Sequence, residues 1–307
     1  MPDVALMVIG VLAAAGGGEF FVRGSVRLAA AMRVPAGIIA ATVAAFATST
    51  PELSVALNAA TTGQPEIPLG DAVGSNVANI GLILGLALII VPLAAHREDI
   101  RRDLPFALAA PSATGLLLYD GALGRVDGAI LIGLFVAWLG ITLIEARRVR
   151  AATAAVFGDT GLGSALTYAA IGMVLLVVAG RLIVVAAKGF GEELGIDPFV
   201  VGATLVAFGT SAPELATTLV AGLRGHAEVA LGTLLGSNIF NNLGIVGVTA
   251  IIEPIHPSGT EVAVALTASA IVLLAVVPGS AGRLGHRRGV SLVAAYAAYV
   301  GALLALT

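Results

Sequence analysis

The sequence contains no cysteine among its 307 residues, and only 11% of its residues are charged. The absence of cysteine excludes a disulfide scaffold, a thiolate metal site and a cysteine nucleophile. Soluble globular domains carry about a quarter charged residues, so the low charge excludes that class. The 16 basic residues are scattered, which excludes a surface of the kind that binds nucleic acid. Because 58% of the residues are hydrophobic, the composition predicts a polytopic protein of the lipid bilayer.

The hydrophobic residues fall into ten segments, separated by short clusters of charge, proline and glycine. A helix needs about 20 apolar residues to cross a bilayer, so a chain of this length can hold about ten spans. The expected fold is therefore all-α, with ten transmembrane helices. We expect them near residues 4–32, 36–62, 68–92, 104–119, 125–146, 163–190, 198–222, 230–252, 260–276 and 289–306.

The basic residues predict the orientation, because cytoplasmic loops are enriched in arginine and lysine. If the N-terminus is outside, the outer side receives only Arg125 and Lys188. The cytoplasmic loops and their flanks then hold Arg23, Arg27, Arg33, Arg97, Arg101, Arg102, Arg147, Arg148, Arg150, Arg224, Arg283, Arg287 and Arg288. We expect both termini outside, residues 147–162 in the cytoplasm, and the chain in a prokaryotic plasma (inner) membrane.

The sequence contains an internal repeat. Residues 46–53 read F-A-T-S-T-P-E-L and residues 208–215 read F-G-T-S-A-P-E-L. Residues 74–79 read G-S-N-V-A-N and residues 236–241 read G-S-N-I-F-N, with the same offset of 162 positions. The two motifs therefore occur once in each half of the chain, in the same order.

The repeat divides the chain into a five-helix unit at 1–146, a cytoplasmic linker at 147–162 and a second five-helix unit at 163–307. Five is an odd number, so the second unit enters the membrane inverted. Inverted repeats in transporters are related by a pseudo-twofold axis in the membrane plane, and the substrate binds near the midplane between them. We expect the same arrangement here.

The first motif of each half places a proline inside a hydrophobic segment. Pro51 and Pro213 remove a backbone hydrogen bond and clash with the carbonyl four residues earlier, which belongs to Ala47 and Gly209. Hydrocarbon offers a freed carbonyl no partner. Together with the hydroxyl groups of the same turn and one glutamate, Glu52 or Glu214, these carbonyls predict a cluster of oxygen donors for a cation.

Oxygen donors select hard cations such as Ca²⁺ or Na⁺. The four histidines fall in or beside loops, which leaves no imidazole for a soft metal site. One unpaired carboxylate at the bilayer centre costs at least about 2.5–3.5 kcal/mol, and two facing carboxylates repel. A cation between Glu52 and Glu214 would remove both costs.

The second motif supplies the other wall of this site. Gly74 and Gly236 allow helices to approach closely. The side chains of Asn79 and Asn241 can ligate a cation without adding charge, and lie one helical turn after a serine of the same motif. The residue pattern does not decide whether Asn76 and Asn238 are ligands or hydrogen-bond the helices together. We interpret Asp71 as a helix N-cap and Glu19 as a solvated or paired charge.

At these residues the sequence resembles the sodium/calcium exchanger family of the cation/calcium antiporter superfamily, in its prokaryotic form. Its two signature regions, the alpha repeats, are similar to residues 38–82 and 200–244 here. The resemblance implies an ion-binding core of spans 2, 3, 7 and 8, past which spans 1 and 6 slide. It also implies a secondary transporter rather than an enzyme, without a cofactor, in which Na⁺ entry drives Ca²⁺ extrusion at three Na⁺ per Ca²⁺.

The resemblance assigns roles to individual residues. Glu52 and Glu214 would bind both Ca²⁺ and Na⁺, and Asn79 and Asn241 would close the middle of the site. The flanking Na⁺ sites would be lined by Thr48, Ser49, Ser75 and the Ala45 carbonyl in one half, and by Thr210, Ser211, Ser237 and the Ala207 carbonyl in the other. Two positions depart from the family pattern: Ala47 replaces glycine, and Asn241 stands where many members carry aspartate, which argues against potassium co-transport.

Three alternatives remain open. Relatives that exchange Ca²⁺ for H⁺ use a different repeat motif, and such an antiporter is the main alternative. A sodium-coupled solute symporter also uses broken helices and inverted repeats, but needs a cavity for its solute. An intramembrane hydrolase needs a nucleophile with a base, or a His-x-x-x-His spacing, and no histidine reaches the membrane interior.

Overall fold

The computed structural model describes residues 2–61, 66–95, 97–153, 162–193, 211–257, 260–277 and 282–306. The first part of the chain forms α1 (Pro2–Met32), α2 (Ala36–Ile39), η1 (Ala40–Ala44), α3 (Ala45–Thr48), α4 (Thr50–Thr61), α5 (Glu66–Val77), η2 (Ala78–Leu84), α6 (Gly85–Ile90), β1 (Leu93–Ala94), α7 (Arg97–Ile100), α8 (Asp103–Leu117), η3 (Leu118–Asp120) and α9 (Arg125–Thr153). The second part forms α10 (Leu162–Glu193), α13 (Ala212–Leu223), α14 (Ala227–Ile239), η5 (Phe240–Ile245), α15 (Val246–Ile252), α16 (Glu261–Leu274), β2 (Arg283–Leu284) and α17 (His286–Leu304).

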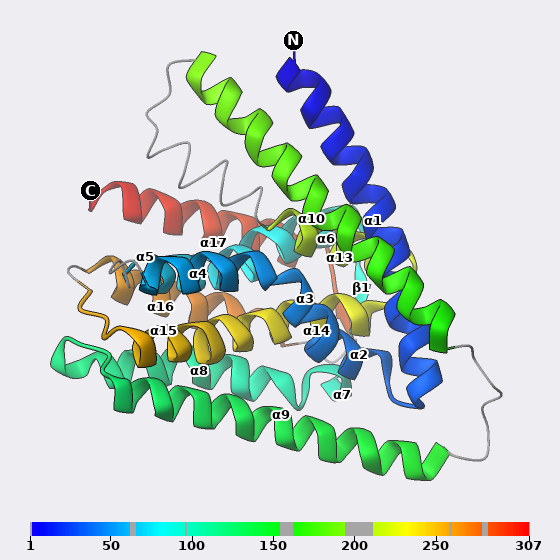
Figure 1. Cartoon of the computed structure of the whole chain (residues 1–307), viewed down its shortest axis with the longest axis horizontal. Coiled ribbons are helices and arrows are strands. Elements are labelled where there is room, and N and C mark those ends of the chain that lie inside the picture. The colour runs from blue at the N-terminus through cyan, green and yellow to red at the C-terminus, as the bar shows by residue number, and fades with distance from the viewer. Residues whose placement is uncertain are drawn as a thin grey trace.

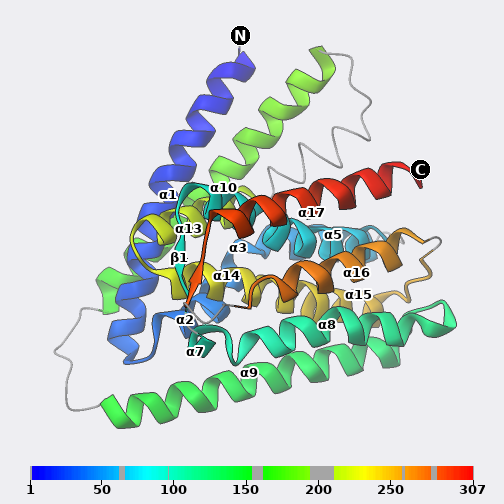
Figure 2. The same cartoon turned by 180° about the vertical axis from the view of Figure 1, so that it is seen from behind.

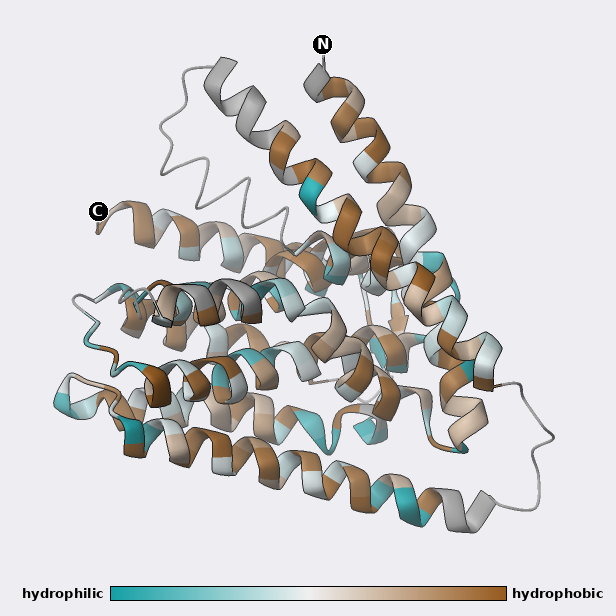
Figure 3. Cartoon of the chain, viewed as in Figure 1, coloured by the Kyte–Doolittle hydropathy of each residue, from teal (hydrophilic) through white to brown (hydrophobic). Residues whose placement is uncertain are grey.

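Helices occupy the predicted hydrophobic segments to within a few residues, except where the seventh segment and the linker fall partly outside the described residues. Among the described residues, five helical stretches are long and apolar enough to cross a membrane. They are Val4–Met32, Glu66–Ile90, Arg125–Val149, Leu162–Ile183 and Ala227–Ile252. Hydrophobic residues run along these helices in Figure 3, and hydrophilic residues lie mostly near helix ends and connections. The chain is therefore an integral membrane protein.

Helices α1 and α10 form a steeply inclined pair that crosses the remaining helices (Figures 1 and 2). A Cβ atom added at Gly10 would lie 2.9 Å from Ile183, and one added at Gly24 would lie 2.3 Å from the backbone nitrogen of Ala169. Positions therefore rise along α1 as they fall along α10, so the helices are antiparallel. Glycine on the facing side lets the two backbones approach closely.

Two short backbone pairings tie the connections together at opposite places in the fold. β1 and β2 are antiparallel, with Leu93 opposite Leu284. An isolated bridge pairs Leu123 with Ile255. Ile255 lies 162 positions after Leu93, and Leu284 lies 161 positions after Leu123. The offset of the internal repeat therefore relates one pairing to the other to within one residue.

Two close helix crossings show the same relation. A Cβ atom at Gly289 in α17 would lie 2.7 Å from the carbonyl oxygen of Gly85 in α6. A Cβ atom at Gly128 in α9 would lie 2.6 Å from the carbonyl oxygen of Gly247 in α15. Gly247 lies 162 positions after Gly85, and Gly289 lies 161 after Gly128. The halves therefore use equivalent glycines for equivalent contacts.

Three segments of the predicted spans are π-helical where the structure describes them: η1, η2 and η5. π-helical turns are rare, occur mostly inside α-helices and are frequent at functional sites. The segments η2 and η5 begin at Ala78 and Phe240, and each includes a predicted ligand, Asn79 or Asn241. The prediction of regular helix through the second motif was therefore incomplete.

The interpretation of Asp71 as an N-cap was wrong. Asp71 lies inside α5, which begins at Glu66. The helix extends further toward its N-terminus than the hydrophobic pattern indicates, because Glu66 favours the first turn through the helix dipole and Pro68 is tolerated there.

Candidate cation-binding site

In each half a serine directly precedes a helix whose first turn carries a glutamate. Ser49 separates α3 from α4 with φ −88° and ψ 12°, and Ser211 precedes α13 with φ −85° and ψ 6°. Glu52 and Glu214 lie in the first turns of α4 and α13. The amino end of a helix dipole favours a carboxylate, so the predicted break also helps to hold the two charges.

Pro51 has no N–H to donate to the carbonyl of Ala47, four residues earlier, as the sequence predicts. The Ser49 N–H donates to the Ala45 carbonyl at 3.0 Å. The Ala45 carbonyl also accepts a hydrogen bond from the Thr48 hydroxyl at 3.2 Å. The Ala45 carbonyl is therefore already hydrogen-bonded twice at the bend.

The structure brings Glu52 and Glu214 together. Their side chains are 3% and 1% exposed, and the two carboxylates interact electrostatically with each other. The Ser49 hydroxyl donates to Glu214 Oε1 at 3.5 Å, a long contact between the halves. Two acids that are 162 positions apart in the sequence therefore share one buried site.

Four asparagines connect the second motifs across the same site. Asn76 Nδ2 donates to the Asn238 carbonyl and Asn238 Nδ2 donates to the Asn76 carbonyl, both at 3.1 Å. Asn79 Nδ2 donates to Asn238 Oδ1 at 3.0 Å, and Asn241 Nδ2 donates to Asn76 Oδ1 at 3.3 Å. Asn76 and Asn238 thus hydrogen-bond the helices together, which favours one of the two interpretations that the sequence left open.

This network uses the amide nitrogens of Asn79 and Asn241 and leaves their amide oxygens without a partner among the described residues. Several buried side-chain atoms at the site have no hydrogen-bond partner within the described residues: Glu52 Oε2, Glu214 Oε2, Asn79 Oδ1, Asn241 Oδ1 and Ser237 Oγ. Unpaired buried polar atoms are costly and rare. Four of these five atoms can only accept hydrogen bonds. Each can therefore be satisfied by a cation or by a hydrogen-bond donor. The donor set fits Ca²⁺ or Na⁺.

The remaining predicted ligands are also buried where the structure describes them. Thr48, Ser49, Ser75 and Ser211 are all buried. Thr210 and the Ala207 carbonyl lie outside the described residues. Within the described chain, no group of three or more His, Asp or Glu gathers to hold a metal. The candidate site therefore depends on two acids supplemented by neutral oxygens.

Sequence reasoning missed several buried polar groups around this site. Thr217, Thr218, Thr233, Asn242 and Ser269 each have a buried polar atom without a partner among the described residues. Asn242 follows Asn241 directly and could have been noticed as a second buried amide. The threonines carry no sequence signal that separates them from ordinary helix residues, because Thr can bond back to its own helix.

An aromatic cluster links the first motif to α9. Phe46 packs against Phe240 with ring centroids 4.8 Å apart, and against Phe135 and Trp138 at 5.6 and 6.3 Å. Phe46 precedes Thr48 by two residues, and Phe240 precedes Asn241. The single tryptophan of the chain is therefore close to the candidate site and can report on it by fluorescence.

We expect Asn238→Leu to weaken cation binding by about tenfold, because it removes two buried hydrogen bonds worth about 1 kcal/mol each. One of them orients Asn79. The measurement is the Ca²⁺ concentration that gives half-maximal change in Trp138 fluorescence. Thr114→Val is the control: it removes a buried hydrogen bond inside α8, to the Ala110 carbonyl, and should leave this concentration within about twofold. Equal effects of the two changes would contradict the positioning role.

Comparison with known proteins gives a consistent result. The family model described as "Sodium/calcium exchanger protein" matches residues 3–144 and again residues 164–305. The chain is 35% identical over 259 residues to the inner membrane protein YrbG of Escherichia coli (strain K12), which covers 81% of this chain and 80% of YrbG. It is 26% identical over 320 residues to the sodium/calcium exchanger MaX1 of Methanosarcina acetivorans, with 89% of each covered.

The fold is also similar to a solved structure. The sodium-calcium exchanger NCX_Mj, soaked with zero Na⁺ and Ca²⁺, superimposes with a TM-score of 0.85 and 29% sequence identity. The superposition covers 98% of this chain and 99% of that chain.

Proposed function

Since this chain belongs to the sodium/calcium exchanger protein family, whose members are membrane antiporters, we propose that it couples Na⁺ entry to Ca²⁺ extrusion. The observation that carries the proposal is the set of unpaired buried oxygens contributed by both halves: Glu52, Glu214, Asn79, Asn241 and Ser237. With both glutamates ionised the site has a formal charge of −2, which one Ca²⁺ neutralises. Na⁺ ions that share the same oxygens would compete with Ca²⁺.

The proposed architecture is ten transmembrane helices in two inverted repeats, residues 1–146 and 163–307. The family model matches each half separately, which supports the duplication. The antiparallel α1–α10 pair and the equivalent backbone pairings support the inversion. We place the chain in the plasma (inner) membrane, with both termini outside and residues 147–162 in the cytoplasm, from the distribution of basic residues.

The proposed ligands for Ca²⁺ are the two glutamates and the two amide oxygens. We propose that Na⁺ also uses Thr48, Ser49, Ser75 and the Ala45 carbonyl on one flank. On the other flank it would use Thr210, Ser211, Ser237 and the Ala207 carbonyl. In the structure the Ala45 carbonyl accepts two hydrogen bonds, so Na⁺ binding there requires the Thr48 hydroxyl to rotate.

Exchange follows from the charge of the site. When cations neutralise the glutamates, the core can pass between outward- and inward-facing states at low electrostatic cost. When the site is empty, its two buried negative charges oppose that movement. We propose that α1 and α10 move past the core as a pair, because their contact with it includes Gly18, where a Cβ atom would lie only 3.0 Å from the Ala216 carbonyl oxygen of α13.

The deciding experiment is ⁴⁵Ca²⁺ uptake by proteoliposomes that contain the purified protein and internal Na⁺. The outward Na⁺ gradient should drive uptake, and a choline-loaded vesicle should not take up Ca²⁺. A proton gradient in place of the Na⁺ gradient tests the alternative. Uptake driven by protons and indifferent to Na⁺ would replace Na⁺/Ca²⁺ exchange by Ca²⁺/H⁺ exchange, and an effect of organic solutes would indicate a symporter.

An ion pair ties α1 to the core in the described state. Arg224, which follows α13, donates to both carboxylate oxygens of Glu19 at 2.7 and 3.0 Å, and Glu19 also pairs with Arg23. This confirms the interpretation of Glu19 as a paired charge. The residue equivalent to Glu19 in the second half is Arg181, so this pair is not repeated with the same charges.

We expect Arg224→Glu to change the ratio of two rates by about two- to fivefold. The first is the rate of Ca²⁺ uptake driven by Na⁺, and the second is the rate of Na⁺ uptake driven by Ca²⁺. The pair is partly exposed and worth about 0–1 kcal/mol, so the effect is small. The reversed pair, Glu19→Arg with Arg224→Glu, should restore the wild-type ratio. A ratio unchanged by the single substitution would show that this ion pair does not bias the two states.

A further inference from the structure

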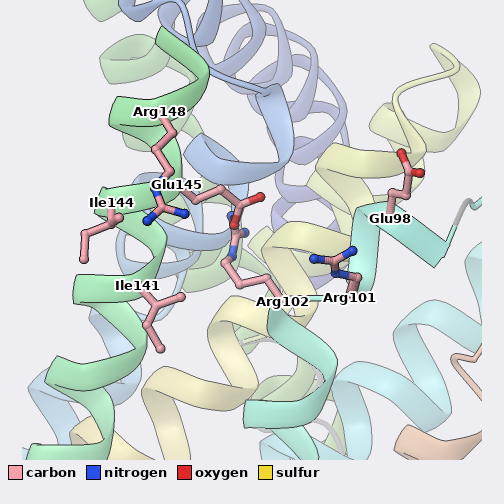
Figure 4. A pocket seen from close by; sticks show the side chains of 7 residues that line it. All are labelled: Glu98, Arg101, Arg102, Ile141, Ile144, Glu145 and Arg148. Atoms are coloured by element: carbon pink, nitrogen blue, oxygen red, sulfur yellow. The ribbon is translucent and has the colours of Figure 1, made fainter. Parts of the chain in front are cut away.

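A pocket of about 680 Å³ lies between the α7–α8 connection and α9, away from the cation site. Figure 4 shows its lining: Glu98, Arg101, Arg102, Ile141, Ile144, Glu145 and Arg148. The guanidinium groups of the three arginines point toward the same space, whereas the Glu98 carboxylate points away from them. From the distribution of basic residues, this end of α9 faces the cytoplasm.

Only one of the three arginines that line the pocket is in an ion pair among the described residues. Arg102 is held by Asp103, with contacts of 2.6 and 2.7 Å, and more weakly by Glu145 at 3.4 Å. Asp103 is in turn fixed by Trp138 Nε1 at 2.9 Å. Arg101 and Arg148 form no ion pair with any described residue. Two free guanidinium groups therefore come from separate elements and face one cavity.

The lining changes from apolar to charged along one stripe of α9. Ile141, Ile144, Glu145 and Arg148 follow at helical spacing on one side of the helix. Ile141 and Ile144 are 47% and 52% exposed, and α9 is exposed over most of its length. The stripe therefore presents hydrocarbon toward the membrane interior and arginine toward the surface, as an acyl chain and its headgroup require.

We propose that this pocket binds the phosphate group of an anionic phospholipid, between Arg101 and Arg148, with an acyl chain along Ile141 and Ile144. Phosphate oxygens accept charge-assisted hydrogen bonds from guanidinium groups, and basic pockets beside membrane helices bind anionic headgroups. A zwitterionic lipid fits less well, because its headgroup cation would lie beside Arg101 and Arg148, which have no ion-pair partner among the described residues. Soluble phosphate shares the headgroup chemistry but makes no use of the two isoleucines.

The test is native mass spectrometry of the full chain, released from vesicles of phosphatidylglycerol and phosphatidylcholine at 1:3. The wild type should retain phosphatidylglycerol. The double variant Arg101→Gln/Arg148→Gln should retain at least about tenfold less of this lipid. The control, Arg97→Gln with Arg147→Gln, removes the same charge from α7 and α9 at nearby positions that do not line the pocket. It should retain lipid as the wild type does.

Further measurements test whether the bound phosphate group belongs to a lipid or to soluble phosphate, and whether the variants fold. Inorganic phosphate at millimolar concentration should not displace the lipid; displacement would identify soluble phosphate as the ligand and overturn the lipid assignment. Ile144→Glu, which places a carboxylate at the apolar side of the pocket, should also lose phosphatidylglycerol. Unchanged Trp138 emission would show that each variant keeps the neighbouring Asp103–Trp138 contact. Equal retention by the pocket variant and its control would overturn the proposal.

Discussion

Glu52→Gln and Glu214→Gln are each expected to reduce Na⁺-driven Ca²⁺ uptake by about 100-fold or more. Removing one partner of a buried charge pair costs about 3–5 kcal/mol because the other charge stays uncompensated, and 1.4 kcal/mol corresponds to tenfold. Here Ca²⁺ would face only one carboxylate, and the occupied site would keep a net charge of +1. The measurement is initial ⁴⁵Ca²⁺ uptake into proteoliposomes with matched protein content.

The same substitutions should have the opposite effect on stability when no cation is present. The two carboxylates are buried together, so either glutamine removes their repulsion. In choline buffer with a calcium chelator we expect each variant to unfold a few degrees above the wild type. Added Ca²⁺ should reverse this order, because it stabilises the wild type by binding to the folded state.

Glu66→Gln serves as the control for both measurements. Glu66 begins α5 in the same half of the chain, and its side chain is exposed. It should leave uptake within about twofold and show no reversal of stability with Ca²⁺, as surface substitutions usually change stability by less than about 0.5 kcal/mol. If uptake survives either glutamate substitution at wild-type rate, the site assignment is wrong, whatever the coupling ion.

The sequence predicts the helical segments, the disturbed helix ahead of Glu52 and the proximity of the two glutamates, because these depend on composition and on the repeat. Proline and a buried acid have strong local consequences, and their recurrence at one offset relates the two halves. The broken helix at Ser49 and the position of Glu52 were therefore predictable without coordinates. The interpretation of Glu19 as a paired charge also agrees with the structure, although its partner Arg224 lies 205 positions away.

The details that complete the site depend on long-range geometry. Whether Asn76 ligates a cation or bonds to Asn238 is decided by which amide atoms face each other across the halves. The π-helical turns at Ala78 and Phe240 change the direction of neighbouring side chains, and no residue preference identifies them in one sequence. The pocket at Arg101 arises from two elements that the hydrophobic pattern does not bring together.

Gly236→Ala should remove most of the folded, active protein. A Cβ atom at Gly236 would lie 2.1 Å from the carbonyl oxygen of Ala41 and 2.7 Å from its carbonyl carbon and Cα. Helix α14 and η1 would have to separate, and overpacking of this kind costs about 1–3 kcal/mol or more. Because Ser237 and Asn238 follow directly, the shift would also move the cation site. We expect a lower thermal midpoint and at least about tenfold less Ca²⁺ uptake per folded molecule.

Gly140→Ala provides the matched control, since a Cβ atom there meets nothing within 4 Å among the described residues. Alanine favours a helix over glycine by about 0.8–1.0 kcal/mol, so this variant should be as stable as the wild type or more stable. The same gain in helix propensity applies at Gly236, and the difference between the variants therefore isolates the contact with η1.

The clash at Gly236 also predicts which second substitution cannot relieve it. The atoms that a Cβ would meet are the backbone O, C and Cα of Ala41, so Ala41→Gly removes none of them. Combined with Gly236→Ala, it should restore neither the thermal midpoint nor uptake. Recovery in the double variant would mean that the contact is made by the Ala41 methyl group, and the close backbone approach of η1 to α14 would be wrong.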